Sequence, residues 1–158
     1  MDYEATVRQT TMQMTVLAFS FVSGVLMFTV AGFVLGPVFD AEGIASTGET
    51  LRLIAIGLPI AAIPVSVQVF MSQSKRMAAM ESWETRIGAL RGRTIVMTAI
   101  FEGPALFSAV VILLTGFSWH AVPALVLFMA AMGGLMPTRG RIANAIGGPD
   151  GSKVDPYS

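Results

Sequence analysis

Residues 94–138 read TIVMTAIFEGPALFSAVVILLTGFSWHAVPALVLFMAAMGGLMPT, with a single formally charged side chain, Glu102, and the only histidine of the chain, His120. A helix that crosses about 30 Å of hydrocarbon at about 1.5 Å per residue needs about 20 mostly apolar residues. This segment is long enough for two such helices. The sequence TGFSWH at 115–120, followed by Pro123, supplies a turn between them. We therefore predict a helical hairpin that crosses a membrane twice.

Two further windows, residues 9–39 and 53–74, contain no charged side chain and hold one span each. They lack the period-two alternation of barrel strands and exceed the length of one, so helices are expected. The first window is also too long for a cleaved signal peptide. We predict an all-α integral membrane protein, a four-helix bundle in a single domain over residues 1–146. Its spans lie at about 13–36, 52–73, 94–115 and 119–137.

The composition agrees with this fold class and excludes several others. Of 158 residues, 54% are hydrophobic and 13% are charged, about half the charged fraction of an average soluble domain. So few charged residues cannot coat a soluble helical domain. The absence of cysteine excludes disulfide scaffolds and thiolate metal sites. Ten basic side chains balanced by ten acidic ones give no basis for nucleic-acid binding, so the expected partner is the lipid bilayer.

The basic side chains are distributed unevenly between the predicted spans. The loop after the first span carries Asp40, Glu42 and Glu49, with Arg52 at its far edge, and the loop after the third span carries no charge. Basic segments mark the cytoplasmic side, and four crossings return the chain to its starting side, so both termini are predicted to be cytoplasmic. The basic residues of the leader, the loop after the second span and the tail are Arg8, Lys75, Arg76, Arg86, Arg91, Arg93, Arg139, Arg141 and Lys153.

Two segments outside the spans have their own patterns. In residues 74–93, apolar side chains such as Met77, Ile87 and Leu90 recur every three or four residues among charged ones. This pattern predicts an amphipathic cytoplasmic helix that caps the bundle, lies on the lipid headgroups or docks a partner. Residues 147–158, GGPDGSKVDPYS, are polar and turn-rich, which predicts a flexible tail.

Glu102 is the one acid within a predicted span. A charged carboxylate at that depth costs about 2.5 kcal/mol or more, so we expect Glu102 to be protonated at neutral pH. No lysine or arginine lies inside a span to pair with it. Its partner must therefore be a polar group, water, a backbone carbonyl or another copy of the protein.

The residues around Glu102 point to two functions. Pro104 has no N–H, so it frees the carbonyl of Ile100 and favours a kink. A carboxyl, a freed carbonyl and the hydroxyl of Thr98 suit a proton or cation site, to which Gln68 of the second span adds a further polar group. Alternatively, a protonated Glu102 hydrogen-bonds a neighbouring helix and specifies assembly.

Small residues four positions apart let helix backbones approach closely. Such pairs flank Glu102 and recur in other spans. They predict tight packing within the chain or between copies, and with it a homo-oligomer. The pairs are Ala99 with Gly103, Ala105 with Ala109, Ser20 with Gly24, Gly32 with Gly36, and Ala130 with Gly134.

The chain lacks the sequence motifs of common enzymes. It has no nucleotide-binding glycine loop, no HExxH and no GxSxG. Paired methionines such as Met77 and Met80 are typical of copper(I) ligands, but His120 lies on the opposite side and cysteine is absent. These methionines are therefore interpreted as packing residues. We predict no catalytic residue, no metal and no cofactor.

Two parts of the sequence resemble a group of small uncharacterised bacterial four-helix membrane proteins. They are Arg93 with the segment AIFEGPALF at 99–107, and MPTRGRI at 136–142, the end of the last span. The resemblance implies four spans and a bacterial inner membrane, and it implies no activity. A membrane-embedded glutamate on a helix rich in small residues is also similar to rotary-ATPase proteolipids. This chain departs from them in lacking a dense glycine repeat in its first helix.

Together, these patterns predict a small polytopic inner-membrane protein without enzymatic activity. It is expected to act as an oligomeric scaffold or as an accessory subunit of a larger membrane complex, organised around Glu102. The alternative is a proton- or cation-translocating oligomer with Glu102 as the ion site.

Overall fold

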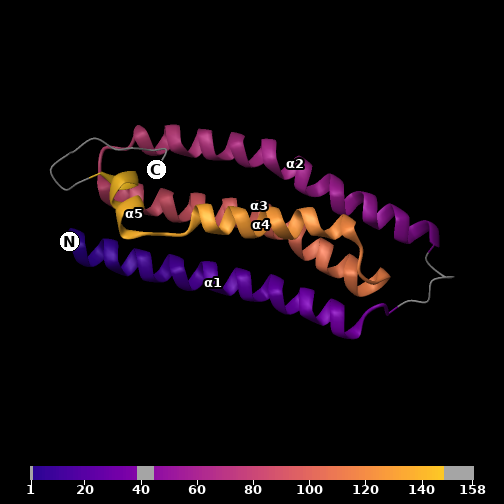
Figure 1. Ribbon diagram of the computed structural model, residues 1–158. Coiled ribbons are helices and arrows are strands. Elements are labelled where there is room, and N and C mark those ends of the chain that lie inside the picture. Colours follow the sequence, from indigo (N-terminus) through magenta and orange to yellow (C-terminus); the bar gives the residue numbers. More distant parts are fainter. Residues whose placement is uncertain (1, 39–44, 148–158) are drawn as a thin grey trace.

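The computed structural model of the protein describes residues 2–38 and 45–147 (Figure 1). Every regular element in these residues is a helix, which confirms the all-α prediction. The predicted acidic loop with Asp40 and Glu42, and residues 148–158 of the predicted tail, lie outside the described residues. The elements are α1 (Tyr3–Leu35), α2 (Ala45–Ala78), α3 (Trp83–Thr115), the 3-10 helix η1 (Trp119–Ala121), α4 (Val122–Leu135) and α5 (Arg139–Ile146).

Helices α1, α2 and α3 are each long and apolar enough to cross a membrane. They contain 33, 34 and 33 residues. At about 1.5 Å per residue each is about 50 Å long, which exceeds the hydrocarbon core by about 20 Å. Arg52 lies near the opposite end of α2, but all three long helices carry basic side chains at one shared end of the molecule, with Arg8 of α1, Lys75 of α2 and Arg86 of α3. We call this the basic end; it also contains α5 (Figure 1).

The last apolar segment differs from the span predicted at 119–137. Helix α4 has 14 residues, about 21 Å, and ends at Leu135. Helix α5 follows it at a bend of 70°, and only the bent pair together is long enough for a fourth span. Pro137 explains the break, because proline lacks the N–H that would continue the helix and disfavours helical backbone at Met136. Thr138 then caps the start of α5.

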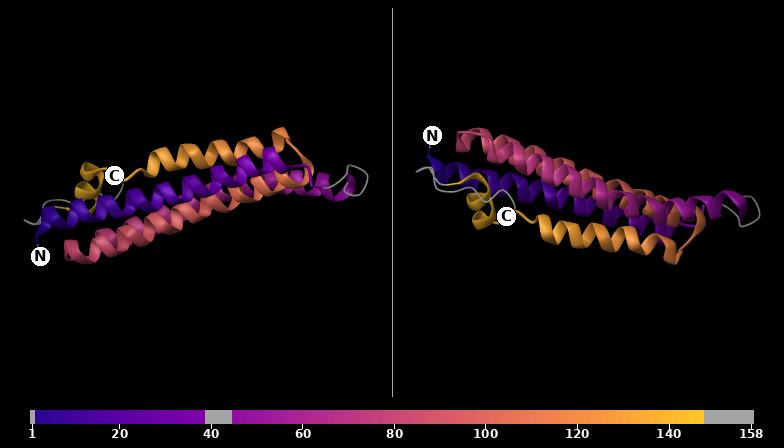
Figure 2. Two further views of the ribbon diagram at one scale, coloured as in Figure 1. Left: turned by 90° about the horizontal axis from the view of Figure 1, so that it is seen from below. Right: turned by 90° about the horizontal axis from the view of Figure 1, so that it is seen from above.

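Helix α3 is central, with α1 and α2 on opposite sides of it and α4 packed against it (Figures 1 and 2). Within its most apolar window, 39% of α3 is buried inside the molecule, against 17% of α1 and 22% of α2. Helices that remain apolar on their outer faces are typical of membrane spans. The core between α1, α3 and α4 consists of Ala18, Val25, Met97, Phe101, Ala105, Phe128 and Met132.

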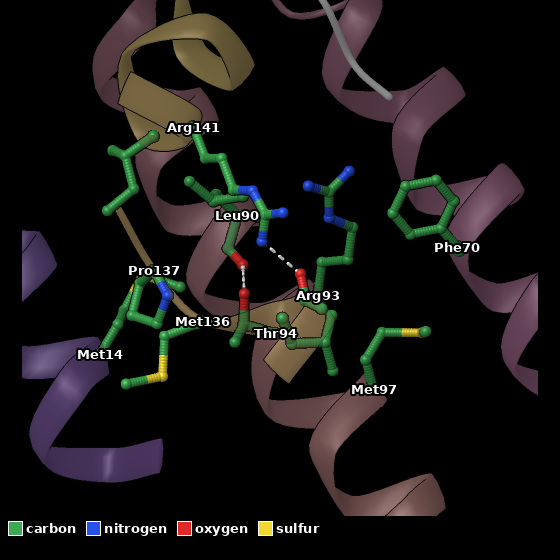
Figure 3. Close-up of a pocket in the computed structure, with 12 residues that line it drawn as sticks. Met14, Phe70, Leu90, Arg93, Thr94, Met97, Met136, Pro137 and Arg141 are labelled. Carbon is green, nitrogen blue, oxygen red and sulfur yellow. Dashed lines mark hydrogen bonds between the residues drawn. The ribbon is translucent and has the colours of Figure 1, made fainter. Parts of the chain in front are cut away.

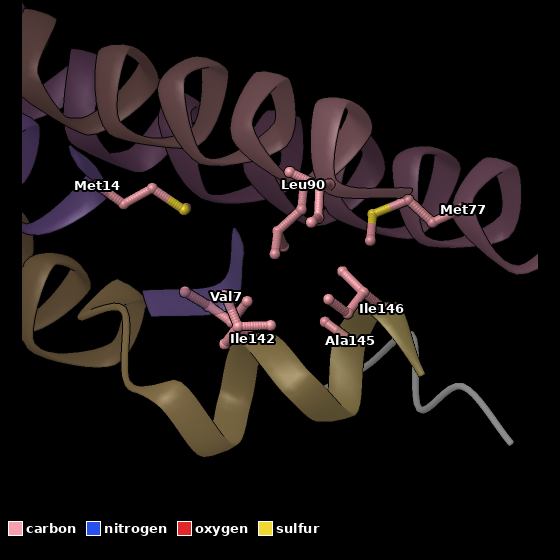
Figure 4. Close-up of a cluster of buried hydrophobic side chains, with 8 residues drawn as sticks. Val7, Met14, Met77, Leu90, Ile142, Ala145 and Ile146 are labelled. Carbon is pink, nitrogen blue, oxygen red and sulfur yellow. The ribbon is translucent and has the colours of Figure 1, made fainter. Parts of the chain in front are cut away.

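The amphipathic segment 74–93 forms parts of two helices instead of one. Helix α2 continues to Ala78, and α3 begins at Trp83, where the Ser82 hydroxyl accepts a hydrogen bond of 3.3 Å from the Thr85 N–H. Serine is a favoured N-cap. The apolar side chains on both sides of the turn pack with α1 and α5 in a second core at the basic end (Figure 4). This core contains Val7, Met14, Met77, Ile87, Leu90, Ile142, Ala145 and Ile146.

Arginine side chains satisfy carbonyl groups at the carboxyl ends of three helices and in the turn after α2. The carbonyls at helix ends have no partner within their own helix and carry the negative end of the helix dipole. A guanidinium group offers several N–H donors to them. Arg52 donates to the Thr115 carbonyl of α3 (3.3 Å), Arg141 to Gly134 of α4, and Arg86 to Ile146 of α5 (2.9 Å) and to Met80 just beyond α2 (2.6 Å).

Candidate functional site

Glu102 lies on the side of α3 that faces α1. It comes seven residues before Ala109 and eleven after Arg91, and these spacings bring residues to one face of a helix. Arg91 donates a hydrogen bond of 2.8 Å to the Thr10 hydroxyl of α1. The Ala109 carbonyl lies 3.1 Å from the position of a Cβ built at Gly32 of α1. The carboxyl of Glu102 therefore lies beside the α1–α3 contact.

The Glu102 side chain is half-buried, and it makes no hydrogen bond or ion pair with any residue that the structure describes. Thr98, one turn before Glu102, is 2% exposed. Ala105 and Ala109, one and two turns after Glu102, are fully covered. These three residues form the protein-facing part of the predicted Glu102 face. Glu102 itself lies at the border between this buried part and the outer surface.

Ala99 and Gly103 lie on the outer side of the same border. Both are exposed, and no atom lies within 4 Å of a Cβ built at Gly103. The described residues therefore leave Gly103 without a close neighbour from another helix, and Ala99 is exposed beside it. This small-residue pair leaves open space on α3 next to a carboxyl that has no partner among the described residues.

The side chains of Ile100 and Pro104 lie on the other side of α3. They follow Arg93 by seven and eleven residues, and Arg93 donates a hydrogen bond of 3.0 Å to the Ser74 hydroxyl of α2. Both are half-buried, and α3 remains helical through Pro104. The side chains of Ile100 and Pro104 thus lie on a different face of α3 from Glu102, whereas Thr98 shares the face of Glu102.

The other predicted site and packing residues divide into close contacts and outer-surface positions. Gly32 and Gly36 lie against the backbone of α3, where built Cβ atoms would come within 3.1 and 2.9 Å of carbonyl oxygens. Gly24 and Gly134 have no atom within 4 Å of a built Cβ. The exposed positions are Gln68, Ser20, Ala130 and Gly134.

A second site surrounds Arg93 at the basic end (Figure 3). Arg93 is only 6% exposed. Its guanidinium group bonds to Ser74 and lies 4.7 Å from the centre of the Phe70 ring, so α2 holds it in place. A buried charge is costly unless polar groups compensate for it, and a cation over an aromatic ring is favourable.

A cavity of about 290 Å³ adjoins Arg93 where α4 ends and α5 begins. Figure 3 shows the guanidinium groups of Arg93, from α3, and Arg141, from α5, on its walls. Among the described residues, no acidic side chain lines it. The other lining residues are Met14, Phe70, Leu90, Thr94, Met97, Gly134, Leu135, Met136, Pro137 and Ile142.

Sequence reasoning did not identify this cavity, although its two arginines belong to the segments that carry the family resemblance. Arg93 lies next to the uncharged part of α3, and Arg141 lies in MPTRGRI at 136–142. Both line the cavity because α5 turns by 70° from the direction of α4. Pro137 signals a break but gives no direction for the turn.

The end of the molecule opposite the basic end, which we call the far end, carries aromatic and polar side chains typical of a membrane–water interface. The Ser118 hydroxyl and His120 Nδ1 are 2.6 Å apart in the turn before α4. Phe117 packs against Phe33 and Trp119, with ring centres 5.5 and 5.4 Å apart. Trp119 is 77% exposed, as is typical of aromatic residues at a membrane–water boundary. The described part of the chain holds no group of three or more histidine, cysteine or acidic side chains placed to bind a metal.

No protein-family model, curated protein or solved structure matches the chain. Fold alone does not imply function, which depends on the chemistry of sites. The Glu102 carboxyl, which has no partner among the described residues, and the two-arginine cavity are the two sites from which function can be inferred.

Proposed function

We propose that the protein is a non-enzymatic scaffold or accessory subunit of the bacterial inner membrane, which assembles through the face of α3 around Glu102. In this proposal the chain crosses the membrane four times and both termini are cytoplasmic. The observation that carries it is a half-buried carboxyl without a partner in the described residues, next to the exposed small residues Ala99 and Gly103.

The position of the termini and the distribution of charge both support the proposed orientation. At the basic end, the Tyr3 hydroxyl donates a hydrogen bond of 3.0 Å to the Gly147 carbonyl, so the two ends of the described chain lie together. Arginine and lysine side chains gather there, which is typical of a cytoplasmic face. These residues are Arg8, Lys75, Arg76, Arg86, Arg91, Arg93, Arg139 and Arg141.

A second copy of the chain is the partner that suits Glu102. A protonated carboxyl has one donor and acceptor capacity, so two of them can satisfy each other. Two copies in the same membrane orientation, related by a two-fold axis, bring Glu102 to the same depth in both. Ala99 and Gly103 would let the two α3 helices approach closely.

Cysteine cross-linking tests this interface directly, because the chain has no native cysteine. We expect Ala99→Cys to form an intermolecular disulfide in membranes, since a two-fold axis at α3 brings the two positions together. Ile63→Cys is the matched control, an apolar position 48% exposed on α2. Equal cross-linking at both positions, or none at Ala99→Cys, would contradict the proposed interface.

The carboxyl is tested with two substitutions of Glu102. We expect Glu102→Gln to keep the oligomer, because an amide can still donate and accept, and Glu102→Ala to weaken it. The measurement is the mass of the detergent-solubilised protein as a function of concentration. An unchanged oligomer in Glu102→Ala would show that the carboxyl is not the assembly contact.

A further inference from the structure

We propose that the cavity between Arg93 and Arg141 binds the phosphate group of an anionic phospholipid. The inference does not depend on the Glu102 interface, because the cavity lies at the basic end and Glu102 does not line it. Its volume, about 290 Å³, is near the lower limit of typical small-ligand pockets.

The charges of the cavity select an anion. Two guanidinium groups line it, and no carboxylate of residues 2–38 or 45–147 does. Arg141 makes one side-chain hydrogen bond in the described part of the chain, to the Gly134 carbonyl, and a guanidinium group has five N–H donors. Guanidinium groups recognise phosphate with paired hydrogen bonds, and the fixed position of Arg93 against Phe70 and Ser74 suits such recognition.

The apolar part of the lining selects a lipid over a soluble phosphate. Met14, Phe70, Met97 and Ile142 reach the cavity from α1, α2, α3 and α5. A free phosphate ion has no apolar group to place against them. A phospholipid carries acyl chains directly below its phosphate, so it matches a site that is cationic on one side and apolar on the other.

The position of the cavity along the bundle fits the depth of a headgroup. Arg93 is the last basic residue before the apolar run of α3, and α4 ends beside it at Leu135. Basic pockets between spans on the cytoplasmic side are typical headgroup sites. The helix is interrupted at Met136 and Pro137. This interruption leaves room for the lipid headgroup where a continuous fourth helix would lie.

The test measures lipid binding to the full-length protein by native mass spectrometry from detergent, with phosphatidylglycerol or phosphatidylcholine added. We expect phosphatidylglycerol to bind more tightly. We expect Arg141→Gln to reduce the affinity for phosphatidylglycerol about fivefold, because one basic residue near an anionic headgroup contributes about that factor to the binding constant. Arg139→Gln is the matched control, since it removes the same charge from an exposed position of α5 outside this cavity.

Four results would overturn the proposal. These are equal binding of the two lipids, an equal loss in Arg139→Gln and Arg141→Gln, no loss in Arg141→Gln, and displacement of phosphatidylglycerol by millimolar inorganic phosphate. The last result would assign the cavity to a soluble phosphate compound. Arg141 is exposed, and the folding of Arg141→Gln is checked by its helical circular dichroism.

Discussion

Gly32 of α1 lies so close to Ala109 of α3 that a Cβ atom at Gly32 would be 3.1 Å from the Ala109 carbonyl oxygen. The same Cβ would be 3.2 Å from the backbone nitrogen of Leu113. Neither group can rotate away, because both belong to the backbone of α3. Any side chain at Gly32 therefore requires α1 and α3 to separate, and Gly32 sets their distance.

Replacing Gly32 by leucine should lower stability by about 1–3 kcal/mol, the usual cost of overpacking. Gly24→Leu is the matched control on the same helix, since no atom lies within 4 Å of a Cβ at that position. Thermal unfolding in detergent, followed by the fluorescence of the two tryptophans, measures both variants. Equal melting temperatures for the two variants would contradict the close packing of α1 and α3.

The long helices could be predicted because hydropathy and charge are local properties of the sequence. Residues 9–39 and 53–74 lack charge, and Gly116 ends α3 at the turn that its sequence indicates. The break within 74–93 was missed because Ser82 starts a new helix without disturbing the apolar period. Periodicity reports which residues share a face, not whether the helix continues across a turn.

The site could be predicted only in part. The position of Glu102 in a helix long and apolar enough to cross a membrane follows from composition, but its neighbours depend on which faces of α3 meet α1 and α2. The sequence grouped Ala99, Gly103 and Ala105 with Glu102, whereas only Ala105 of these three is buried. The cavity beside Arg93 depends on the fold-back of α5, which is a tertiary contact without a local signal.

Arg86 should be the most important residue for holding α5 in place. It donates to the Met80 carbonyl at 3.0 and 2.6 Å and to the Ile146 carbonyl at 2.9 Å. Arg86→Ala should cost about 2 kcal/mol and speed hydrogen exchange of the α5 amides. Arg86→Lys should restore little of the lost stability, because a single ammonium group lacks the planar set of N–H donors that reaches both carbonyls.

The control for Arg86 is Arg76→Ala. Arg76 is exposed at the end of α2, and its side chain makes no hydrogen bond with the described residues. Its substitution should leave exchange of the α5 amides unchanged. Similar exchange in both variants would mean that net charge at the basic end, and not the Arg86 contacts, holds α5.

Ser108 should be replaceable without loss of stability. It is 0% exposed, and its hydroxyl has no hydrogen-bond partner among the described residues. A buried polar atom without a partner costs about 1–3 kcal/mol, so Ser108→Ala should keep or raise the melting temperature. Ser66 is the control, since it is buried and donates a hydrogen bond of 2.7 Å to the Ile63 carbonyl. A greater loss in Ser108→Ala than in Ser66→Ala would contradict this expectation.

The proposed orientation predicts which positions can be labelled from outside the cell. Glu81→Cys places a thiol in the turn at the basic end, and Phe117→Cys places one at the far end, where Phe117 is 50% exposed. With the basic end cytoplasmic, a membrane-impermeant maleimide should label only Phe117→Cys in intact spheroplasts. Both positions should react after permeabilisation. Labelling of Glu81→Cys in intact spheroplasts would reverse the orientation.

The assembly proposal and the ion-translocation alternative differ in what they predict for Glu102→Gln. Assembly predicts that this variant keeps its function, and ion translocation predicts that it loses its function. A translocating carboxyl must release its proton, and an amide cannot, whereas an amide can still hydrogen-bond a second copy. In proteoliposomes with an internal pH dye, we expect wild type and Glu102→Gln to show equal proton flux, no faster than protein-free liposomes. A protonophore added at the end confirms that the gradient was intact. Wild-type flux that Glu102→Gln abolishes would assign Glu102 to ion translocation.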